Sequence, residues 1–300
     1  MITLRQIRSV VAVYEEGSFT RAAARENATQ SGVSQHVASV ETALGVTLFD
    51  RTTEGVLPTP AGRRYYAHAI AVLRHLEEAA GEARAAATGV SGPLRAGLMP
   101  AFTRAALAPV LDRFLADYPE VQLQIIEGYS GALTDMVRAE TLDFALVPAS
   151  PAGVGLTVSH LVQDREMLVS GPARGLPHGR PLRLSDLGPL KVVVPSVTNV
   201  RRTKLEEYFE THGVRVERLM EMDAMLGTLQ LVARSDWVTV LPGLICVSDA
   251  DGARRRVSPL SDPPLYSDFV VIEPARRPLS PQARLFLDAL RDEVTRLAAA

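Results

Sequence analysis

The stretch GSFTRAAARENATQSGVSQHVASVE, residues 17–41, predicts two short helices joined by a tight polar turn. Ser18 follows a glycine and precedes a helical pattern, so it is placed to cap a helix over 19–26. Thr29 is placed to cap a second helix, which should run to about Leu44 and end at Gly45. Such a pair is either part of a helical core or a helix-turn-helix, whose second helix enters the major groove of DNA.

The second helix of this pair separates apolar and polar side chains. Val33, Val37 and Val40 face inward, and the alanines of RAAA at 21–24 allow the two helices to approach closely. The opposite face carries Gln30, Ser31, Ser34, Gln35 and Ser39, with His36 at its edge. These uncharged donors and acceptors suit base edges and phosphates, whereas a merely solvated face more often carries Lys and Glu. The residues therefore favour a reader of DNA over a piece of core.

The residues around the pair complete a compact N-terminal domain. A helix is expected over 3–16, and VTLFDRTTEGVLPTP at 46–60 predicts a small β-wing with the polar tip RTTEG. Thr59 and Pro60 open a long helix to about residue 87. Its apolar side chains form a heptad seam of Tyr65, Ala69, Val72, Leu76, Ala79 and Ala83. We interpret this seam as a dimer contact; the alternative is a helix that lies on its own domain.

The composition of the 300 residues is that of an ordinary globular protein, with 47% hydrophobic residues and a formal net charge of −2. Residues 1–65 carry seven arginines and six acidic residues, which is a weak positive balance for a DNA-binding domain. No long apolar run and no secretory signal is apparent, so we expect a cytoplasmic protein without a membrane partner.

The sequence contains no recognisable catalytic or metal-binding motif. The single cysteine, Cys246, lies in the apolar run GLICV and is expected to be a buried small hydrophobic residue, which excludes a two-cysteine switch. The six histidines are scattered, and no metal-binding pair, nucleophile motif or phosphate-binding loop is found. We therefore expect neither an enzyme nor a metal or other cofactor.

From Leu94 onward short apolar strands alternate with helices. The segments LRAGL, VQLQIIE and DFALVP are separated by predicted helices over 102–117 and 131–139. The same alternation returns with LKVVVP, VRVERLM and WVTVLP, and a last strand, SDFVVIEP, precedes a helix over 280–298. This pattern predicts two similar α/β halves with parallel strands.

The run GSFTRAAA…QSGVSQHVASVETALGVTLFDRT…LPTPAG closely resembles the N-terminal domain of LysR-type transcriptional regulators, and the rest of the chain fits the same family. The resemblance implies a winged helix-turn-helix over 1–58 and a linker and dimerisation helix over 59–89. It implies an effector-binding domain over 90–300, similar to periplasmic binding proteins, with lobe 1 at about 90–162 plus 267–300 and lobe 2 at about 163–266. It further implies a homodimer that assembles into a homotetramer on promoter DNA, bends it and contacts RNA polymerase.

The resemblance also assigns roles in the DNA-binding domain. Thr29 and Gln30 match the start of the recognition helix, and Arg51 matches the wing arginine expected to meet phosphate. Gln35 stands where the family often has arginine, which suggests a preference for adenine, and Glu54 places an acid at the wing tip. The full expected DNA-binding set is Ser18, Thr20, Arg21, Thr29, Gln30, Ser31, Ser34, Gln35, His36 and Arg51.

In the domain that resembles the effector domain, ligands are expected beyond the carboxyl ends of the strands. The expected effector-binding set is Met99, Pro100, Ala101, Phe102, Thr103, Tyr129, Ser130, Pro148, Ser196, Thr198, Asn199, Arg201, Met222 and Asp223. The hydroxyl that the family has after the first strand corresponds to Ala101 or Thr103, because the spacing to Pro109 is one residue longer here.

Helix N-termini and hydroxyl groups in this set favour a small organic acid as effector. The alternative is that the hydroxyls only cap helices, and Asp223 disfavours a purely anionic ligand. Two other function classes stay open, namely a sensor that acts through protein contacts alone and a solute-binding protein. A solute-binding protein would leave the helix-turn-helix unexplained. Titration with promoter DNA distinguishes a DNA-binding regulator from a sensor that acts through protein contacts alone.

Overall fold

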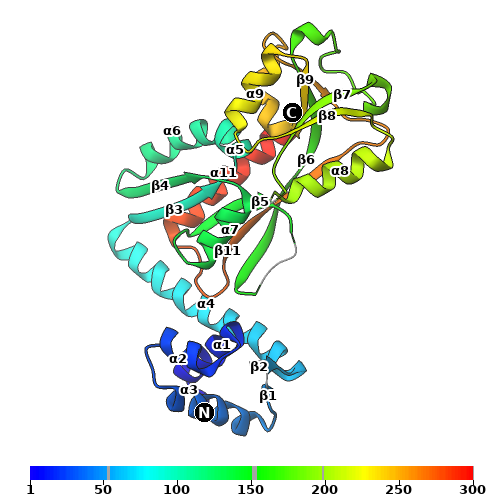
Figure 1. Ribbon diagram of the computed structural model, residues 1–300. Helices are drawn as coiled ribbons and strands as arrows, with labels where there is room; N and C mark the ends of the chain where they lie inside the picture. Colours follow the sequence, from blue (N-terminus) through cyan, green and yellow to red (C-terminus); the bar gives the residue numbers. More distant parts are fainter. Residues whose placement is uncertain (53–54, 151–153, 198, 300) are drawn as a thin grey trace. The chain divides into compact units, whose positions relative to one another are not determined.

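The computed structural model describes residues 1–300 except 53–54, 151–153, 198 and 300, and describes no side chain at 51, 52, 82 and 84–88. The chain forms two compact units (Figure 1). The N-terminal unit contains residues 1–89, a short segment that ends at Leu156, and residues 274–280; the rest of the chain forms the second unit. Residues 274–280, which the sequence analysis assigns to lobe 1, group by their contacts with the N-terminal unit.

The N-terminal unit begins with three helices, α1 (Leu4–Glu16), α2 (Phe19–Arg25) and α3 (Gln30–Leu44). The hydroxyls of Ser18 and Thr29 accept hydrogen bonds from the first turns of α2 and α3, so both predicted caps are confirmed. Gly45 ends α3 with φ at 70°, a conformation that glycine adopts without a steric penalty. The three helices share a core that includes Val10, Val13, Phe19, Ala22, Val33, Val37 and Val40.

An antiparallel hairpin of β1 (Phe49–Thr52) and β2 (Gly55–Pro58) follows α3, as predicted for the wing. The tip residues 53 and 54, which include the acid at the tip, lie outside the described residues. The carboxylate of Glu41 holds the hairpin to α3 because it accepts hydrogen bonds from the backbone N–H of Leu48 at 2.7 Å and of Phe49 at 3.3 Å.

The long helix α4 (Pro60–Thr88) starts at the predicted residues and is 29 residues long. Gly62 lets it pass close to the wing, since a Cβ there would lie 2.1 Å from the carbonyl oxygen of Leu48. Tyr66 stacks on Tyr14 of α1 with ring centroids 3.8 Å apart. A small apolar cluster joins α1, α4 and the segment 274–280, and its buried members are Val11, Ala69, Ile70, Leu73 and Ala275.

The second unit contains the predicted α/β pattern. In its first half β3 (Gly92–Leu98) pairs in parallel with β4 (Val121–Glu127) and β5 (Phe144–Pro148), and α6 (Ala108–Asp117) and α7 (Ser130–Arg138) connect them. In its second half β7 (Leu190–Val194) pairs in parallel with β8 (Val216–Glu221) and β9 (Trp237–Pro242), connected by α8 (Val200–Thr211) and α9 (Met225–Arg234). Each parallel pair therefore has its crossover helix.

Long antiparallel strands join the two halves into one sheet, with strand order β4-β3-β5-β11-β6-β9-β7-β8. These are β6 (Leu156–Ser170) and β11 (Tyr266–Pro274); β10 (Arg256–Pro259) pairs with β6 beside this path. The final helix α11 (Pro281–Ala298) packs on α6. The short elements are α5 (Pro100–Phe102), η2 (Pro172–Arg174), η3 (Leu184–Leu187), α10 (Gly243–Cys246) and η4 (Val247–Asp249). None of the helices in the described ranges is both long enough and apolar enough to cross a bilayer.

The segment between β3 and α6 departs from a regular helix. The sequence predicts one helix over 102–117, but α5 is followed by a π-helical turn, η1 (Thr103–Leu107), before α6 begins. A π turn closes its hydrogen bonds over one more residue than an α turn does. It therefore accommodates one extra residue, which gives a structural reason for the longer spacing before Pro109.

Candidate functional site

The exposed face of α3 carries the predicted DNA-reading side chains. Gln30, Ser31 and Gln35 are exposed, while the three valines on the other side of the helix are buried in the core. Thr20, in the first turn of α2, is exposed as well, and Ser34 is half-buried. The structure therefore presents an uncharged row of donors and acceptors on α3, and the valines fix its direction.

Other predicted DNA-binding residues make contacts within the unit. Ser18 and Thr29 use their hydroxyls as caps. His36 Nδ1 lies 2.8 Å from the hydroxyl of Ser9, which is buried in α1, so one edge of the imidazole is turned toward the protein. The backbone of Arg51 pairs with Val56 in the hairpin, and its side chain lies outside the described residues.

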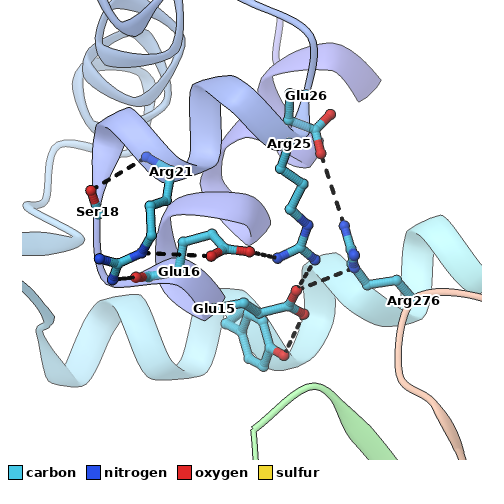
Figure 2. A network of polar contacts seen from close by, with 8 residues as sticks. Glu15, Glu16, Ser18, Arg21, Arg25, Glu26 and Arg276 are labelled. Atoms are coloured by element: carbon cyan, nitrogen blue, oxygen red, sulfur yellow. Dashed lines mark hydrogen bonds and ion pairs between the residues drawn. The ribbon is translucent and has the colours of Figure 1, made fainter. Parts of the chain in front are cut away.

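A network of charged residues connects α1, α2 and the segment 274–280 (Figure 2). The carboxylate of Glu15 accepts hydrogen bonds from Arg25 and, at 2.8 Å, from the hydroxyl of Tyr66. Arg276 Nε lies 3.2 Å from the same carboxylate, and Arg276 also lies 3.9 Å from Glu26. Glu15 is therefore a shared partner of side chains from α2, α4 and the segment 274–280.

The neighbouring pairs in this network involve Glu16. Its carboxylate lies 2.6 Å from Arg25, and Arg21 reaches back to the backbone carbonyl of Glu16 (Figure 2). Burial lowers the pKa of Arg25, but hydrogen bonding to Glu15 and the charges of Glu15 and Glu16 outweigh it and raise the pKa overall. Arg21 and Arg25 thus hold α2 to α1, which reduces the positive charge that α2 can offer to DNA.

The second unit contains a pocket between its two lobes. Its cavity volume is about 30 Å³, and the pocket is partly open to solvent. Residues after β3 and β4 line it from lobe 1, and residues from β7, α8, α9 and β9 line it from lobe 2. This is the place where ligands bind in open α/β sheets, beyond the carboxyl ends of parallel strands.

Seven of the predicted effector-binding residues line this pocket: Met99, Pro100, Ala101, Tyr129, Asn199, Arg201 and Met222. The other lining residues were not predicted from the sequence, namely Val193, Val194, Pro195, Met225, Thr228, Thr239, Leu241, Pro242, Ile245 and Phe269. Most of these are apolar and lie inside predicted strands and helices. The sequence did not identify them as lining residues, because a strand that ends at a pocket has the same apolar pattern as a strand in the core.

Of the remaining predicted residues, those that the structure describes are not part of the pocket wall, and several have other roles. Phe102 is fully buried against Phe269, and Pro148 is buried at the end of β5. Thr103 donates a hydrogen bond to Glu127, and Asp223 accepts one from the backbone N–H of Ser196 at 3.0 Å. Thr198 lies outside the described residues.

Ser130, also predicted as an effector-binding residue, begins α7 and is 5% exposed. Its hydroxyl has no hydrogen-bond partner among the described residues. The hydroxyl does not cap α7, and it does not line the pocket.

The arginine of the pocket wall is held by a buried carboxylate. Arg201 donates to Glu166 from Nη2 at 2.7 Å and from Nε at 3.1 Å, in the bidentate geometry typical of this pair. Nη2 also donates to the carbonyl oxygen of Val240 at 3.1 Å, and Glu166 accepts a further bond from Ser267 at 2.5 Å. The Arg201 side chain is therefore a structural partner of Glu166 as well as a lining residue.

Cys246 is buried, as the sequence predicts, and lies next to the lining residue Ile245. Burial raises the pKa of its thiol, and the nearby carboxylates of Asp249 and Asp164 raise it further. Reactive thiols are accessible and have lowered pKa values. Cys246 has neither property.

Comparisons with known families cover both units. The family described as "Bacterial regulatory helix-turn-helix protein, lysR family" matches residues 4–63, and "LysR substrate binding domain" matches residues 87–295. The first match contains α1–α3 and the hairpin, and the second contains the pocket.

Curated relatives match most of the chain. The nitrogen assimilation regulatory protein nac of Escherichia coli (strain K12) is 25% identical over 295 residues, which are 98% of this chain and 96% of the relative. A probable hydrogen peroxide-inducible genes activator of Streptomyces viridosporus is 33% identical over 242 residues, covering 80% of this chain and 77% of the relative.

Solved structures share the fold. An H2O2-bound mutant of Corynebacterium glutamicum OxyR has a TM-score of 0.60 and 21% identity, covering 100% of this chain and 96% of its own. Full-length CbnR in complex with its target DNA has a TM-score of 0.55 and 21% identity, covering 97% and 99%. With a DNA-binding N-terminal unit and a C-terminal effector-binding unit, this chain belongs to the LysR family of transcriptional regulators, which are not enzymes.

Proposed function

We propose that this regulator reads its operator with Gln30, Ser31 and Gln35 of α3. The observation that supports this most directly is the exposed uncharged face of α3, held in position by three buried valines. Asparagine and glutamine pair with the N6 and N7 atoms of adenine, so Gln35 should favour adenine at one position of the operator. Because α3 carries no arginine or lysine, backbone affinity depends on residues elsewhere and on several copies of the chain.

Selection from a random pool of double-stranded DNA tests this assignment, because it requires no assumption about the operator sequence. The wild type should enrich a defined motif, and Gln35→Ala should enrich a motif with one position relaxed. Thr42→Ala is a matched control, because Thr42 is exposed on the same helix and its hydroxyl bonds to the carbonyl oxygen of Ala38. Equal weakening on all sequences by Gln35→Ala, or no enrichment by the wild type, would contradict the proposal.

The chain is proposed to act as a homodimer along α4, and as a homotetramer through its effector-binding units. Val72 and Leu76 support the dimer because they are 46% and 40% exposed at neighbouring seam positions. Ala79 and Ala83 continue the exposed stripe, while Ala69 is buried and Tyr65 is half-buried within the N-terminal unit. The working seam is therefore the part of α4 from Val72 onward.

Light scattering of the purified protein tests the seam. Leu76→Asp should lower the molar mass of the assembly, because a carboxylate placed in an apolar contact is desolvated without a partner. His75→Asp, an exposed position one residue away, should leave the mass unchanged. An unchanged mass for Leu76→Asp would show that α4 does not form the contact.

The effector is proposed to bind in the pocket between the two lobes and to change their closure. A ligand shifts such an equilibrium only as far as it binds the two states differently. The resulting change would alter the positions of the paired DNA-binding units, DNA bending and contact with RNA polymerase in the cytoplasm. Footprints and bending that stay identical with and without the effector would exclude this mechanism.

The sequence favours a small organic acid as effector, and two features of the pocket bear on that proposal. The N-terminal turns of α7 and α8 supply backbone N–H groups, which support an acid. The guanidinium of Arg201, which lines the pocket, is already bound to Glu166. An acid would therefore depend on the helix ends and the uncharged polar lining side chains rather than on this guanidinium.

A peroxide response through cysteine is not part of the proposal, although a relative is named a probable hydrogen peroxide-inducible genes activator. Peroxide oxidises thiolates that are exposed and have low pKa values. Cys246 is the single cysteine of the chain, is buried and has a raised pKa.

A further inference from the structure

The core of the N-terminal unit contains a buried hydroxyl. Ser9 of α1 is 3% exposed, and it is the only polar residue among the buried ones that the structure describes in this unit. A hydroxyl that is removed from water costs free energy unless it makes a hydrogen bond. The hydrogen bond found for Ser9 goes to another helix, because its Oγ lies 2.8 Å from Nδ1 of His36 on α3. The buried hydroxyl is therefore directed at the helix that carries the DNA-reading side chains.

The imidazole of His36 is bound at one ring nitrogen and accessible at the other. The residue is half-buried, and Nδ1 is turned toward α1 by its hydrogen bond to Ser9. Nε2, on the opposite edge of the ring, makes no hydrogen bond in the part of the chain that the structure describes. The buried side-chain atoms without a partner are, among the described residues, Ser130 Oγ and Arg202 Nε. Since Nε2 of His36 is not one of them, it is open to solvent.

The position of His36 on α3 is at the margin of the DNA-reading face. Successive residues of an α-helix are about 100° apart around its axis. The side chain of His36 therefore points between the direction of Gln35, which is exposed, and that of Val37, which is buried. When a recognition helix lies in the major groove, the phosphates border the groove on either side of the bases. A donor at the margin of the polar face suits a phosphate oxygen better than a base edge.

The hydrogen bond to Ser9 determines which ring nitrogen can offer a proton to DNA. In a neutral imidazole one nitrogen donates and the other accepts, whereas a hydroxyl can do either. When Ser9 donates to Nδ1, the ring proton is on Nε2. In the other tautomer Nε2 would present a lone pair to a phosphate oxygen, so that two acceptors would face each other. Contact with a phosphate therefore favours donation from Ser9 to Nδ1 and from Nε2–H to the DNA.

We propose that Ser9 is a positioning residue for DNA binding, which holds the His36 imidazole so that Nε2–H donates a hydrogen bond to a phosphate of the operator. Ser9 is buried and acts only through His36. Because α3 carries no arginine or lysine, this uncharged donor fixes the register of the helix in the groove without adding charge. The inference rests on the proposed reading of DNA by α3 and adds a backbone contact to it.

Fluorescence anisotropy of the full-length protein with a labelled pool of random duplexes tests the pair, because phosphate contacts do not depend on sequence. His36→Ala removes the donor and should weaken binding about two- to tenfold, the effect of one neutral hydrogen bond. Ser9→Ala should weaken binding at least about twofold, because the imidazole loses its orientation. In the His36→Ala background, Ser9→Ala should have no further effect on affinity. Additive losses, or unchanged affinity for Ser9→Ala, would overturn the proposal.

A pair of substitutions at position 9 separates the hydroxyl from packing. Threonine and valine have nearly the same shape, and only threonine carries a hydroxyl. Ser9→Thr should therefore bind DNA at least about twofold more tightly than Ser9→Val, even where the added methyl groups lower the stability of both. Thr42→Ala, which removes an exposed hydroxyl bonded to the carbonyl oxygen of Ala38, should bind as the wild type does. Equal affinities of Ser9→Thr and Ser9→Val would show that Ser9 acts by packing and would contradict the proposal.

Selection from the random pool separates this inference from the proposed function. A phosphate contact carries no sequence information, so His36→Ala should enrich the same motif as the wild type while its affinity falls. Relaxation of one motif position by His36→Ala would contradict the phosphate assignment. A wild type that enriches no motif would contradict base reading by α3, whereas the pairing of Ser9 with His36 would still be decided by the anisotropy measurements.

Discussion

Arg276 Nε lies 3.2 Å from Glu15 Oε2, so the turn between β11 and α11 is paired with the last turn of α1. Glu15 has only 8% of its side chain exposed, and it also bonds to Arg25 and Tyr66. Removing its charge leaves two guanidiniums without their shared partner. We expect Glu15→Gln to lower the free energy of opening of α1 and α2 by about 3 kcal/mol.

Hydrogen exchange of the backbone amides measures this opening directly. Arg276→Ala should cost about 1 kcal/mol, because Arg276 is partly exposed and contributes one of several partners. Glu77→Gln is the control, since its 3.8 Å pair with Arg8 is half exposed on both sides, and it should change little. If Glu15→Gln and Glu77→Gln lowered the free energy of opening equally, Glu15 would not be the shared partner that stabilises α1 and α2.

Gly62→Ala should destabilise the N-terminal unit. The added Cβ would lie 2.1 Å from the carbonyl oxygen of Leu48, and the obstacle is backbone rather than a movable side chain. We expect a loss of about 1–3 kcal/mol in urea unfolding, typical of overpacking. Gly131→Ala in α7 meets no atom within 4 Å and should be neutral or stabilising. A neutral Gly62→Ala would mean that α4 separates easily from the wing.

Asp164 should make stability depend on pH. Burial raises its pKa to about 6, chiefly by desolvation, and the charge of Glu166 adds to the rise. The folded state therefore binds a proton that the unfolded state releases near pH 4, so stability rises as pH falls from about 7 to 4. Asp164→Asn should be more stable than the wild type at pH 8 by about 1–3 kcal/mol, and nearly equal to it at pH 4. A difference in Tm that is constant across this range would contradict the assignment.

Cys246 should react slowly with thiol reagents in the native protein. The thiol is buried, burial raises its pKa, and its Sγ lies 3.6 Å from the carbonyl oxygen of Pro242. We expect labelling by iodoacetamide at pH 8 to be at least about a hundredfold faster in urea than in buffer, because the thiolate forms only after opening. Rapid native labelling would indicate that α10 opens readily.

The N-terminal unit was largely predictable because its signals are local. The caps at Ser18 and Thr29 and the stop at Gly45 lie within one turn of the residues that they affect. The pairing of Glu15 with Arg276 was not predictable, since 261 positions separate the two residues and nothing in either sequence neighbourhood indicates the other. The grouping of residues 274–280 with α1 and α4 depends on that pairing and on Ala275.

The pocket was predicted in its position and only partly in its chemistry. Residues directly after strands, such as Met99 and Tyr129, could be assigned from topology alone. The role of Arg201 could not, because the sequence does not show that β6 places Glu166 beside it. Met225 and Thr228 lie in α9 and line the pocket. The sequence pattern of a helix does not show which of its buried residues face the core and which face a pocket. Charge at a binding site is thus set by partners that are distant in sequence.

The turn at 274–280 limits how the protein can be divided for study. A fragment that starts near residue 90 would retain Ala275 and Arg276. It would lack Val11 and Ala69, which pack with Ala275, and Glu15, which pairs with Arg276. Ala275, which is buried in the intact protein, would become exposed in this fragment and favour self-association at the concentrations that crystallisation requires. A fragment of the effector-binding half would therefore be improved by a polar residue at 275, and the intact chain is the sounder starting material.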